Sequence, residues 1–292
     1  MTLFKGSGVA LVTPFDKEGN IDFNVLEDLI NFQIKNGTDA LIICGTTGEA
    51  RTMTKDEQIS VVKFAVEKTN KRIPVIAGAG GNNTKEVVEF SKIMEDAGAD
   101  GLLSVTPYYN KASYDGLIKH YHSQGDAVNI PIIVYNVPGR TGLNISPNQM
   151  KEIGEHENIV GIKEASGDIV QAMEIRRLCP NLDIYSGNDD IVVPLMSIGG
   201  KGVISVLANI MPKETSEMCH LYLDGNEKEA GKKQVKYLKL IKALFKEVNP
   251  VPVKAALEIM GYNSTNLRLP LTKANKNTFD ELKEILKELE VI

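Results

Sequence analysis

Short apolar runs recur along the chain, each followed by a longer stretch with the apolar spacing of an amphipathic helix. The runs lack the alternation of a half-exposed strand, which is typical of parallel strands covered by helices. The predicted strands span residues 9–12, 40–43, 73–77, 101–105, 130–135, 159–162, 183–185 and 203–206. The helices predicted between them include residues 23–35, 55–68, 85–97, 114–127 and 169–178.

Eight strand–helix units favour an α/β fold in which the strands close into a (β/α)8 TIM barrel. The alternative is an open, doubly wound sheet. We disfavour the open sheet because no glycine-rich dinucleotide-binding sequence follows the first predicted strand.

The strand signal stops near Asn226, and the remaining sequence predicts three helices at residues 227–246, 252–260 and 280–290. We therefore expect a barrel domain over residues 1–224 and a C-terminal helical domain over residues 225–292. No low-complexity linker separates them, so the helical domain is expected to pack on the barrel.

The first helix of this C-terminal region is rich in lysine, which would suit a membrane surface or a partner helix. A solvated face is the preferred interpretation, because this length and pattern are ordinary for a globular helix. The residues then expected to face inward are Val235, Leu238, Ile241, Leu244 and Phe245.

Several predicted helices begin with a capping residue. Thr54, with Glu57 three residues later, has the spacing of a capping box. Thr84 and Asp168 are expected to cap their helices in the same way. Asp189 and its neighbour Asp190 could bind a metal, but capping of the following helix is the preferred interpretation.

The composition excludes several classes of protein. The 292 residues carry a net charge of −5 and are 42% hydrophobic, which does not suggest a nucleic-acid partner or an anionic membrane surface. No apolar stretch reaches the roughly 18 residues of a membrane span, and the first residues lack the apolar core of a signal peptide. The spacing of Cys44, Cys179 and Cys219 fits no metal or disulfide framework, so a cytoplasmic protein is expected.

The candidate for chemistry is Lys163, which ends the otherwise apolar run of residues 159–163. Burial disfavours the charged ammonium and lowers its pKa, and a neutral amine is a nucleophile toward carbonyl carbon. Barrel enzymes place their chemistry at the carboxyl ends of their strands. The sequence therefore predicts an enzyme that forms a Schiff base.

Other strand ends supply further polar groups. Thr46 and Thr47, flanked by glycines, could bind a small anion, although a plain turn accounts for most such sequences. The phenol of Tyr135 could shuttle protons beside a buried amine, and Arg140 could bind a carboxylate. Paired tyrosines such as Tyr108 and Tyr109 are usually packing residues. Their joint position at strand ends is the informative feature.

With these residues the chain resembles the dihydrodipicolinate (4-hydroxy-tetrahydrodipicolinate) synthases, members of the pyruvate-dependent class I aldolase superfamily that includes N-acetylneuraminate lyase. The resemblance extends over essentially the full length. The motifs that carry it, in the order and spacing of that family, are residues 45–49, 106–110, 135–142, 161–167 and 202–206.

The resemblance implies that Lys163 forms an imine with pyruvate and that Tyr135 is the central proton relay. Thr46 would link Tyr135 to Tyr109, and this Tyr109 would come from a neighbouring subunit of a homo-oligomer, a tetramer built as a dimer of dimers. Thr47 would bind the pyruvate carboxylate.

For the second substrate, the resemblance implies that Arg140 binds the carboxylate of L-aspartate-4-semialdehyde. The backbone carbonyls of Gly187 and Ile204 would line the pocket. No metal or organic cofactor is implied, and the product would enter lysine and diaminopimelate biosynthesis.

Two departures from the family pattern stand out. Ala112 replaces a frequent proline, and Lys55 and Gln58 stand where lysine-inhibited members have histidines. Asn82 and Glu86 do match the inhibitory site of those members. The departures predict weak or absent inhibition by L-lysine.

Two alternatives are open at this point. A related aldolase that cleaves sialic acid or a deoxy sugar acid would share Lys163 and Tyr135, but Arg140 argues against the sialate lyases. The other alternative is a barrel that binds a keto acid without turnover.

Overall fold

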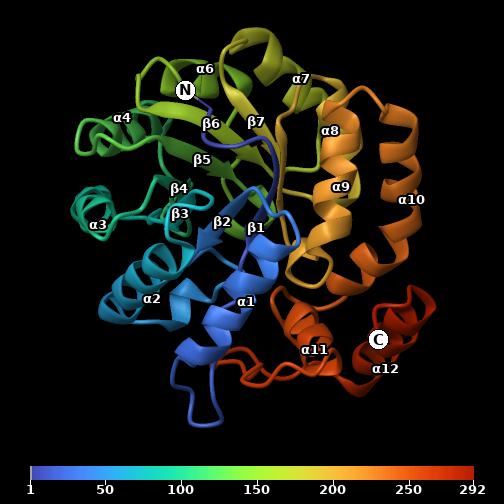
Figure 1. The fold of residues 1–292 in the computed structure, drawn as a ribbon. Coiled ribbons are helices and arrows are strands. Elements are labelled where there is room, and N and C mark those ends of the chain that lie inside the picture. The colour runs from blue at the N-terminus through green and yellow to red at the C-terminus, as the bar shows by residue number, and fades with distance from the viewer. Residues whose placement is uncertain (1) are drawn as a thin grey trace.

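The computed structural model describes residues 2–292 and contains eight parallel strands that close into a barrel in chain order (Figure 1). The closing pair joins β1 to β8, with Gly6 opposite Gly202 and Val9 opposite Ser205. The predicted TIM barrel is confirmed and the open sheet is wrong. The strands are β1 Gly6–Ala10, β2 Ala40–Ile43, β3 Val75–Gly78, β4 Gly101–Val105, β5 Ile132–Asn136, β6 Ile159–Glu164, β7 Asp183–Ser186 and β8 Gly202–Ser205.

Helices surround the barrel on its outside (Figure 1). They are α1 Phe23–Lys35, α2 Lys55–Thr69, α3 Thr84–Asp96, α4 Tyr114–Gly125, α5 Pro138–Thr141, α6 Pro147–Ile153, α7 Ile169–Leu178, α8 Val192–Ser197 and α9 Pro212–Leu223. Three short 3-10 helices, η1 Ala50–Thr52, η2 Asp189–Ile191 and η3 Leu207–Asn209, lie in loops after strands. The five helices predicted between strands are all present.

The largest error in a strand boundary concerns β1, which begins at Gly6 rather than at Val9. Residues 6–8 are buried but carry no large apolar side chain, so the hydrophobic pattern does not mark them. A methyl group added at Gly8 would lie 2.7 Å from the ring of Phe4. The glycine leaves room for this ring, which packs inside the barrel.

Two of the predicted caps are confirmed and one is wrong. Thr54 and Glu57 form a capping box at the start of α2, and the Asp168 carboxylate accepts hydrogen bonds from the backbone at the start of α7. The cap of α3 is Asn83, whose side chain accepts from Lys85 N. Thr84 is instead the first helical residue.

Side chains from alternate positions of the strands fill the barrel interior. This inner cluster comprises Phe4, Ala10, Ala40, Ile42, Ile76, Leu103, Ile133, Tyr135, Val137, Tyr185 and Ile204. A second, larger cluster lies between the strands and the helices and continues into the C-terminal region, where it includes Leu240, Val253 and Leu282. The barrel is therefore a filled core and not a pore.

The C-terminal region consists of α10 Glu227–Leu244, α11 Val251–Ile259 and α12 Lys276–Glu288. Helix α10 packs against α8 and α9, and α12 contacts both α10 and α11. The core is continuous here, and the domain boundary at residues 224 and 225 stays a prediction. No helix within residues 2–292 combines the length and apolar character needed to span a membrane.

The predicted inward face of α10 is partly wrong, because Val235 is 72% exposed and Phe245 is also exposed. Leu238 is only half-buried. The buried stripe is Ala230, Gln234, Tyr237, Leu240, Ile241, Ala243 and Leu244. Its helical spacing includes small and polar residues, whereas the prediction chose the most hydrophobic ones.

A buried ion pair fastens the C-terminal region to the barrel. Lys254 of α11 contacts Glu49, which follows β2, and both side chains are almost wholly excluded from solvent. The Lys254 ammonium also donates to Asn266 O at 2.7 Å and lies over the Phe15 ring, 4.4 Å from its centroid. Glu49 has a left-handed backbone conformation with φ 54°, so this pairing helps hold a strained turn beside Thr46 and Thr47.

Candidate active site

A cavity of about 110 Å³ lies where the strands end, and it contains the buried lysine. Both Tyr135 and Lys163 are the second-last residues of their strands, which places this cavity at the carboxyl end of the barrel. The lining residues are Ala10, Ile42, Gly45, Thr46, Thr47, Leu103, Tyr135, Val137, Arg140, Lys163, Ala165, Gly187, Asn188, Val206, Phe245 and Asn249. Six of the eight residues proposed from sequence are therefore brought together here.

Lys163 is buried on β6 and lies opposite Tyr135 of β5 in the strand register. Its ammonium nitrogen lies 4.4 Å from the centroid of the Tyr135 ring. The pKa of Lys163 is lowered to about 8, chiefly by burial; the negative charge of Asp189 opposes this shift and the positive charge of Arg140 adds to it. About a tenth of the amine is therefore neutral at pH 7.

Gly187, directly after β7, gives the lysine its space. A methyl group built at this glycine would lie 3.1 Å from Lys163 Cε and 2.5 Å from Ala165 Cβ. Any larger residue would push against the lysine side chain. The conformation of Lys163 thus depends on the absence of a side chain at position 187.

Burial also raises the pKa of Tyr135 to about 12, while the charge of Arg140 and a hydrogen bond with the Thr46 hydroxyl lower it. The phenol therefore keeps its proton at neutral pH, beside the amine. A proton donor next to a nucleophilic amine suits the addition of that amine to a carbonyl group.

Asn249 connects two residues predicted to bind carboxylates. Its side-chain amide donates to Thr47 Oγ1 at 2.9 Å, and its backbone carbonyl accepts from Arg140 Nη2 at 3.3 Å. Arg140 belongs to the short helix α5 and is exposed at the cavity. The C-terminal region thus contributes directly to the geometry of the site.

The remaining two predicted residues do not line the cavity. Tyr109 is 91% exposed and has φ 72°, so within one chain it lies outside the site. Ile204 of β8 is buried in the barrel interior with Tyr135, and the residue of that segment that reaches the cavity is Val206.

The sequence analysis missed Asn249 and Phe245 and misassigned Asp189. Asn249 and Thr47 are 202 residues apart, so no local pattern links them. Asp189 was expected to cap a helix, but no side chain caps η2. The buried Asp189 carboxylate instead accepts hydrogen bonds from Ser205, the last residue of β8, and from the backbone of the next two residues.

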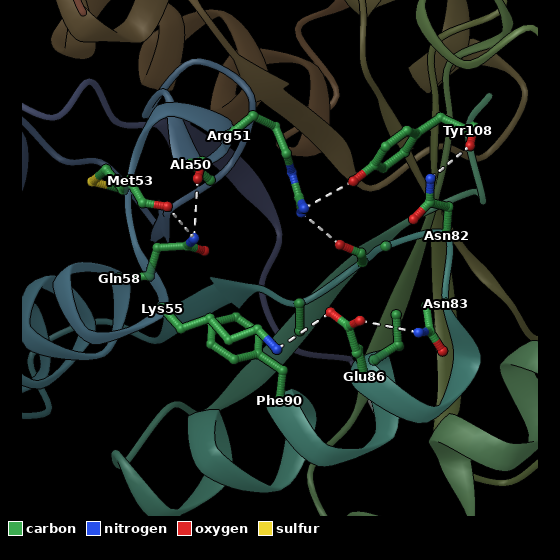
Figure 2. A pocket seen from close by; sticks show the side chains of 14 residues that line it. Ala50, Arg51, Met53, Lys55, Gln58, Asn82, Asn83, Glu86, Phe90 and Tyr108 are labelled. Atoms are coloured by element: carbon green, nitrogen blue, oxygen red, sulfur yellow. Dashed lines mark hydrogen bonds and ion pairs between the residues drawn. The ribbon is translucent and has the colours of Figure 1, made fainter.

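A second pocket of about 240 Å³ lies between α2, α3 and the loop before α4, and Figure 2 shows its side chains. Lys55 Nζ lies 3.3 Å from Glu86 Oε2 there. Arg51 donates to the Tyr108 hydroxyl at 2.9 Å and to Gly80 O at 2.6 Å. The charged side chains lining the pocket are therefore two cations and one carboxylate, all from a single chain.

Known proteins resemble this chain over nearly its whole length. A 4-hydroxy-tetrahydrodipicolinate synthase of Caldicellulosiruptor saccharolyticus is 55% identical over 286 residues, which cover 98% of this chain and 97% of that protein. A dihydrodipicolinate synthase of Acinetobacter baumannii, solved in complex with pyruvate, is 43% identical with a TM-score of 0.97 and full coverage of both chains.

The similarity extends to a lysine-bound enzyme and to the family as a whole. The enzyme of Cyanidioschyzon merolae, solved with lysine bound, is 37% identical, has a TM-score of 0.97 and is covered over 100% of both chains. Residues 3–289 match the profile of the Dihydrodipicolinate synthetase family. A chain with this barrel, a buried lysine at the end of β6 and a match of this extent belongs to the dihydrodipicolinate synthetase family.

Proposed function

We propose that this enzyme, a lyase of the aldolase type, condenses pyruvate with L-aspartate-4-semialdehyde through an imine at Lys163. The reaction is the one for which its relatives are named, and it is the first committed step of lysine and diaminopimelate biosynthesis. The observation that carries the proposal is the buried Lys163, whose lowered pKa supplies a neutral amine beside the Tyr135 phenol.

In the proposed reaction, Lys163 attacks the keto carbon of pyruvate to give a carbinolamine. Loss of water, with uptake of one proton, leaves a cationic imine. The imine withdraws electrons, so the methyl group loses a proton and the resulting enamine attacks the aldehyde. The product amine then cyclises onto the imine carbon and releases Lys163. The imine itself is the electron sink, so we propose no metal or organic cofactor.

Each neighbouring group has a proposed role in these steps. Tyr135 returns and removes protons, and its hydrogen bond with Thr46 supports this relay. Thr47, oriented by Asn249, binds the pyruvate carboxylate. The backbone carbonyl of Gly187 completes the pocket wall, whereas Ile204 lies behind it in the barrel interior. The three free cysteines and the reaction type support a cytoplasmic location.

The test of this function is a coupled assay with both substrates. Turnover of pyruvate and aspartate semialdehyde, with no cleavage of N-acetylneuraminate, is the expected result. Cleavage of a sialic or deoxy sugar acid without condensation would favour the related lyases. Imine formation without any turnover would indicate a protein that only binds a keto acid.

Arg140 is predicted to select the second substrate, because its planar fork can hold a carboxylate in a way that lysine cannot copy. Replacing Arg140 with alanine should raise the KM for aspartate semialdehyde roughly 10- to 100-fold and that for pyruvate less than about threefold, as expected for one lost charged hydrogen bond. Arg177, an exposed arginine on α7, provides the control substitution to alanine. Equal changes in both KM values would contradict the assignment.

Inhibition by L-lysine is expected to be weak or absent. Lys55 already contacts Glu86, and Arg51 adds a second positive charge, whereas free L-lysine is itself a net cation (Figure 2). Titration of L-lysine into the coupled assay should therefore leave most activity at millimolar concentration. Inhibition at submillimolar L-lysine would refute this expectation. The variant Lys55→His, which carries the residue of lysine-inhibited members, should be the more sensitive of the two.

We further propose that each active site is built from two chains, in a tetramer assembled as a dimer of dimers. The support is Tyr109, an aromatic side chain exposed almost completely on a strained backbone. In this arrangement its hydroxyl would reach Thr46 of the neighbouring subunit, which is also exposed on the single chain.

Mixing experiments test the shared site. Tyr109→Phe and Lys163→Ala homo-oligomers should both be strongly impaired, and co-refolded hybrids should regain part of the native activity. In a hybrid dimer, one site combines the intact Lys163 with the intact Tyr109, and the other site carries both lesions. Hybrids that form without any recovery would show that Tyr109 does not act across subunits.

A further inference from the structure

Asp189 is a buried carboxylate close to the site that the proposed reaction does not use. It begins η2, three residues after β7 ends at Ser186. Its oxygens accept a hydrogen bond from Ser205 Oγ at 2.5 Å and from the backbone N–H groups of Val206 and Leu207, each at 3.0 Å. All three partners are donors, since Ser205 Oγ itself accepts from Ala208 N. The pattern fits an ionised carboxylate.

No ion pair within residues 2–292 includes Asp189, so its charge has no cation in direct contact. Burial raises the pKa of Asp189 above its ordinary value, and the three donors and the charge of Lys163 oppose that rise only in part. Burying an ionised group without a paired cation is costly, and three hydrogen bonds offset only part of that cost. The buried Asp189 carboxylate is therefore a candidate for a functional role.

The chain leading to Asp189 passes next to Lys163. Register pairs join Lys163 to Tyr185 and Glu164 to Ser186, and Gly187 then faces the lysine side chain at Cε. Asn188 lines the cavity, and Asp189 follows directly. The negative charge of Asp189 raises the pKa of Lys163.

We propose that Asp189 is a positioning residue of the active site, whose negative charge stabilises the cationic imine at Lys163 and whose hydrogen bonds hold the loop after β8 against the cavity. The inference rests on the proposed Schiff-base function and deepens it. Gln234 of α10 donates to the Asp189 backbone carbonyl at 2.8 Å and so fixes this residue from the outside.

The charge balance of the reaction explains why such a residue is useful. When the carbinolamine takes up a proton and loses water, a C–O bond breaks, a C=N bond forms and one positive charge remains on nitrogen. The charged groups that act on Lys163 are Arg140, which is positive and opposes this step, and Asp189, which favours it. The phenol of Tyr135 is neutral. The positive charge of Lys163 lowers the pKa of Asp189. The negative charge of Asp189 also raises the pKa of the Cys219 thiol.

The substitution Asp189→Asn tests the charge with little change of shape. An asparagine can accept from Val206 N and Leu207 N through its oxygen and donate through its amide to Ser205 Oγ. Asp190→Asn is the matched control, because it removes the same charge from the exposed neighbouring residue.

The readout is the rate of borohydride trapping of the pyruvate imine as a function of pH, with kcat measured in parallel. Loss of the Asp189 charge lowers the pKa of Lys163, so the midpoint of trapping should move down by about one pH unit. The maximal rate and kcat should fall by roughly tenfold or more, because the cationic imine is less stable. Asp190→Asn should keep the native midpoint.

An unchanged midpoint in a folded Asp189→Asn protein would overturn the inference, as would an equal shift in Asp190→Asn. If Asp189→Asn does not fold, the pH midpoint of trapping is measured with Asp189→Ser, whose smaller side chain leaves room for water. The same downward shift is expected for this variant. Trapping with the native protein distinguishes failure of the proposed Schiff-base function from failure of the role of Asp189. Absence of a trapped adduct at Lys163 in the native chain would remove the proposed function itself, whereas a normal native adduct with an unshifted variant removes only the role of Asp189.

Discussion

Replacing Lys163 with alanine should abolish the borohydride-trapped pyruvate adduct and reduce condensation by roughly 10³-fold or more, as expected when the nucleophile of a covalent mechanism is removed. The physical reason is that, within residues 2–292, Lys163 supplies the one amine that lines the cavity. Mass spectrometry of the intact chain after reduction with pyruvate measures the adduct, which should amount to one reduced pyruvyl group per native chain.

The pH dependence of the same experiment follows from the pKa of Lys163. Because burial lowers this pKa to about 8, the neutral amine is a minority below pH 8 and the majority above it. Trapping by the native chain should therefore accelerate as the pH rises through 8. Lys85→Ala, which removes an exposed lysine of α3, serves as the control and should keep the adduct. An adduct of native yield in Lys163→Ala would place the chemistry elsewhere.

Replacing Lys254 with methionine should destabilise the protein by about 3–5 kcal/mol, the usual consequence of removing one partner of a buried ion pair. The remaining Glu49 would be buried without a cation, in a turn already held at positive φ. Urea denaturation of the native and variant chains measures the difference in free energy of unfolding. Because Glu49 follows Thr46 and Thr47 closely, the variant should also bind pyruvate less well.

Lys273→Met is the matched control for this substitution. Lys273 forms an exposed pair with Glu258, and such surface pairs contribute little, so the control should retain nearly native stability. Combining Lys254→Met with Glu49→Gln removes both charges, and the double variant should lose less stability than the sum of the two single variants. Additive losses would mean that the pair is not coupled.

Most of the fold could be predicted because the eight strands are buried on both sides and therefore stand out as apolar runs. The exceptions have local causes. The first residues of β1 are glycine and serine, which are buried although they have no large apolar side chain. Gly8 lies against the Phe4 ring, and Gly6 lies against Asp39 and His220. The inward stripe of α10 includes Gln234, whose amide donates to a backbone carbonyl, so its burial depends on a partner far away in the sequence.

The predicted site residues could be grouped because a parallel barrel brings all strand ends to one face. The grouping of these residues can be predicted without knowledge of loop structure. In the structure, one cavity is lined by Lys163, Tyr135, Thr46, Thr47 and Arg140. The roles of these residues rest on the family resemblance and on the chemistry of their surroundings.

The parts of the site that could not be predicted depend on long-range contacts. Asn249 meets Thr47 across 202 residues of sequence, and Lys254 meets Glu49 in the same way. Neither contact has a periodic pattern or a motif that marks it. Asp189 was misassigned because a carboxylate after a strand has the local pattern of a helix cap, whereas its partners belong to the next strand–loop unit.

The hydrogen bond from Asn249 to Thr47 also affects when, during synthesis of the chain, the site can be complete. A ribosome that has released residues 1–224 has delivered every strand and the reactive amine, but the amide that orients the Thr47 hydroxyl is still to come. The same holds for the ammonium that neutralises Glu49. A nascent or prematurely terminated chain therefore carries Lys163 before Asn249 can contact Thr47 and Arg140, the residues proposed to bind the two carboxylates. These contacts form last, through a residue synthesised after the whole barrel.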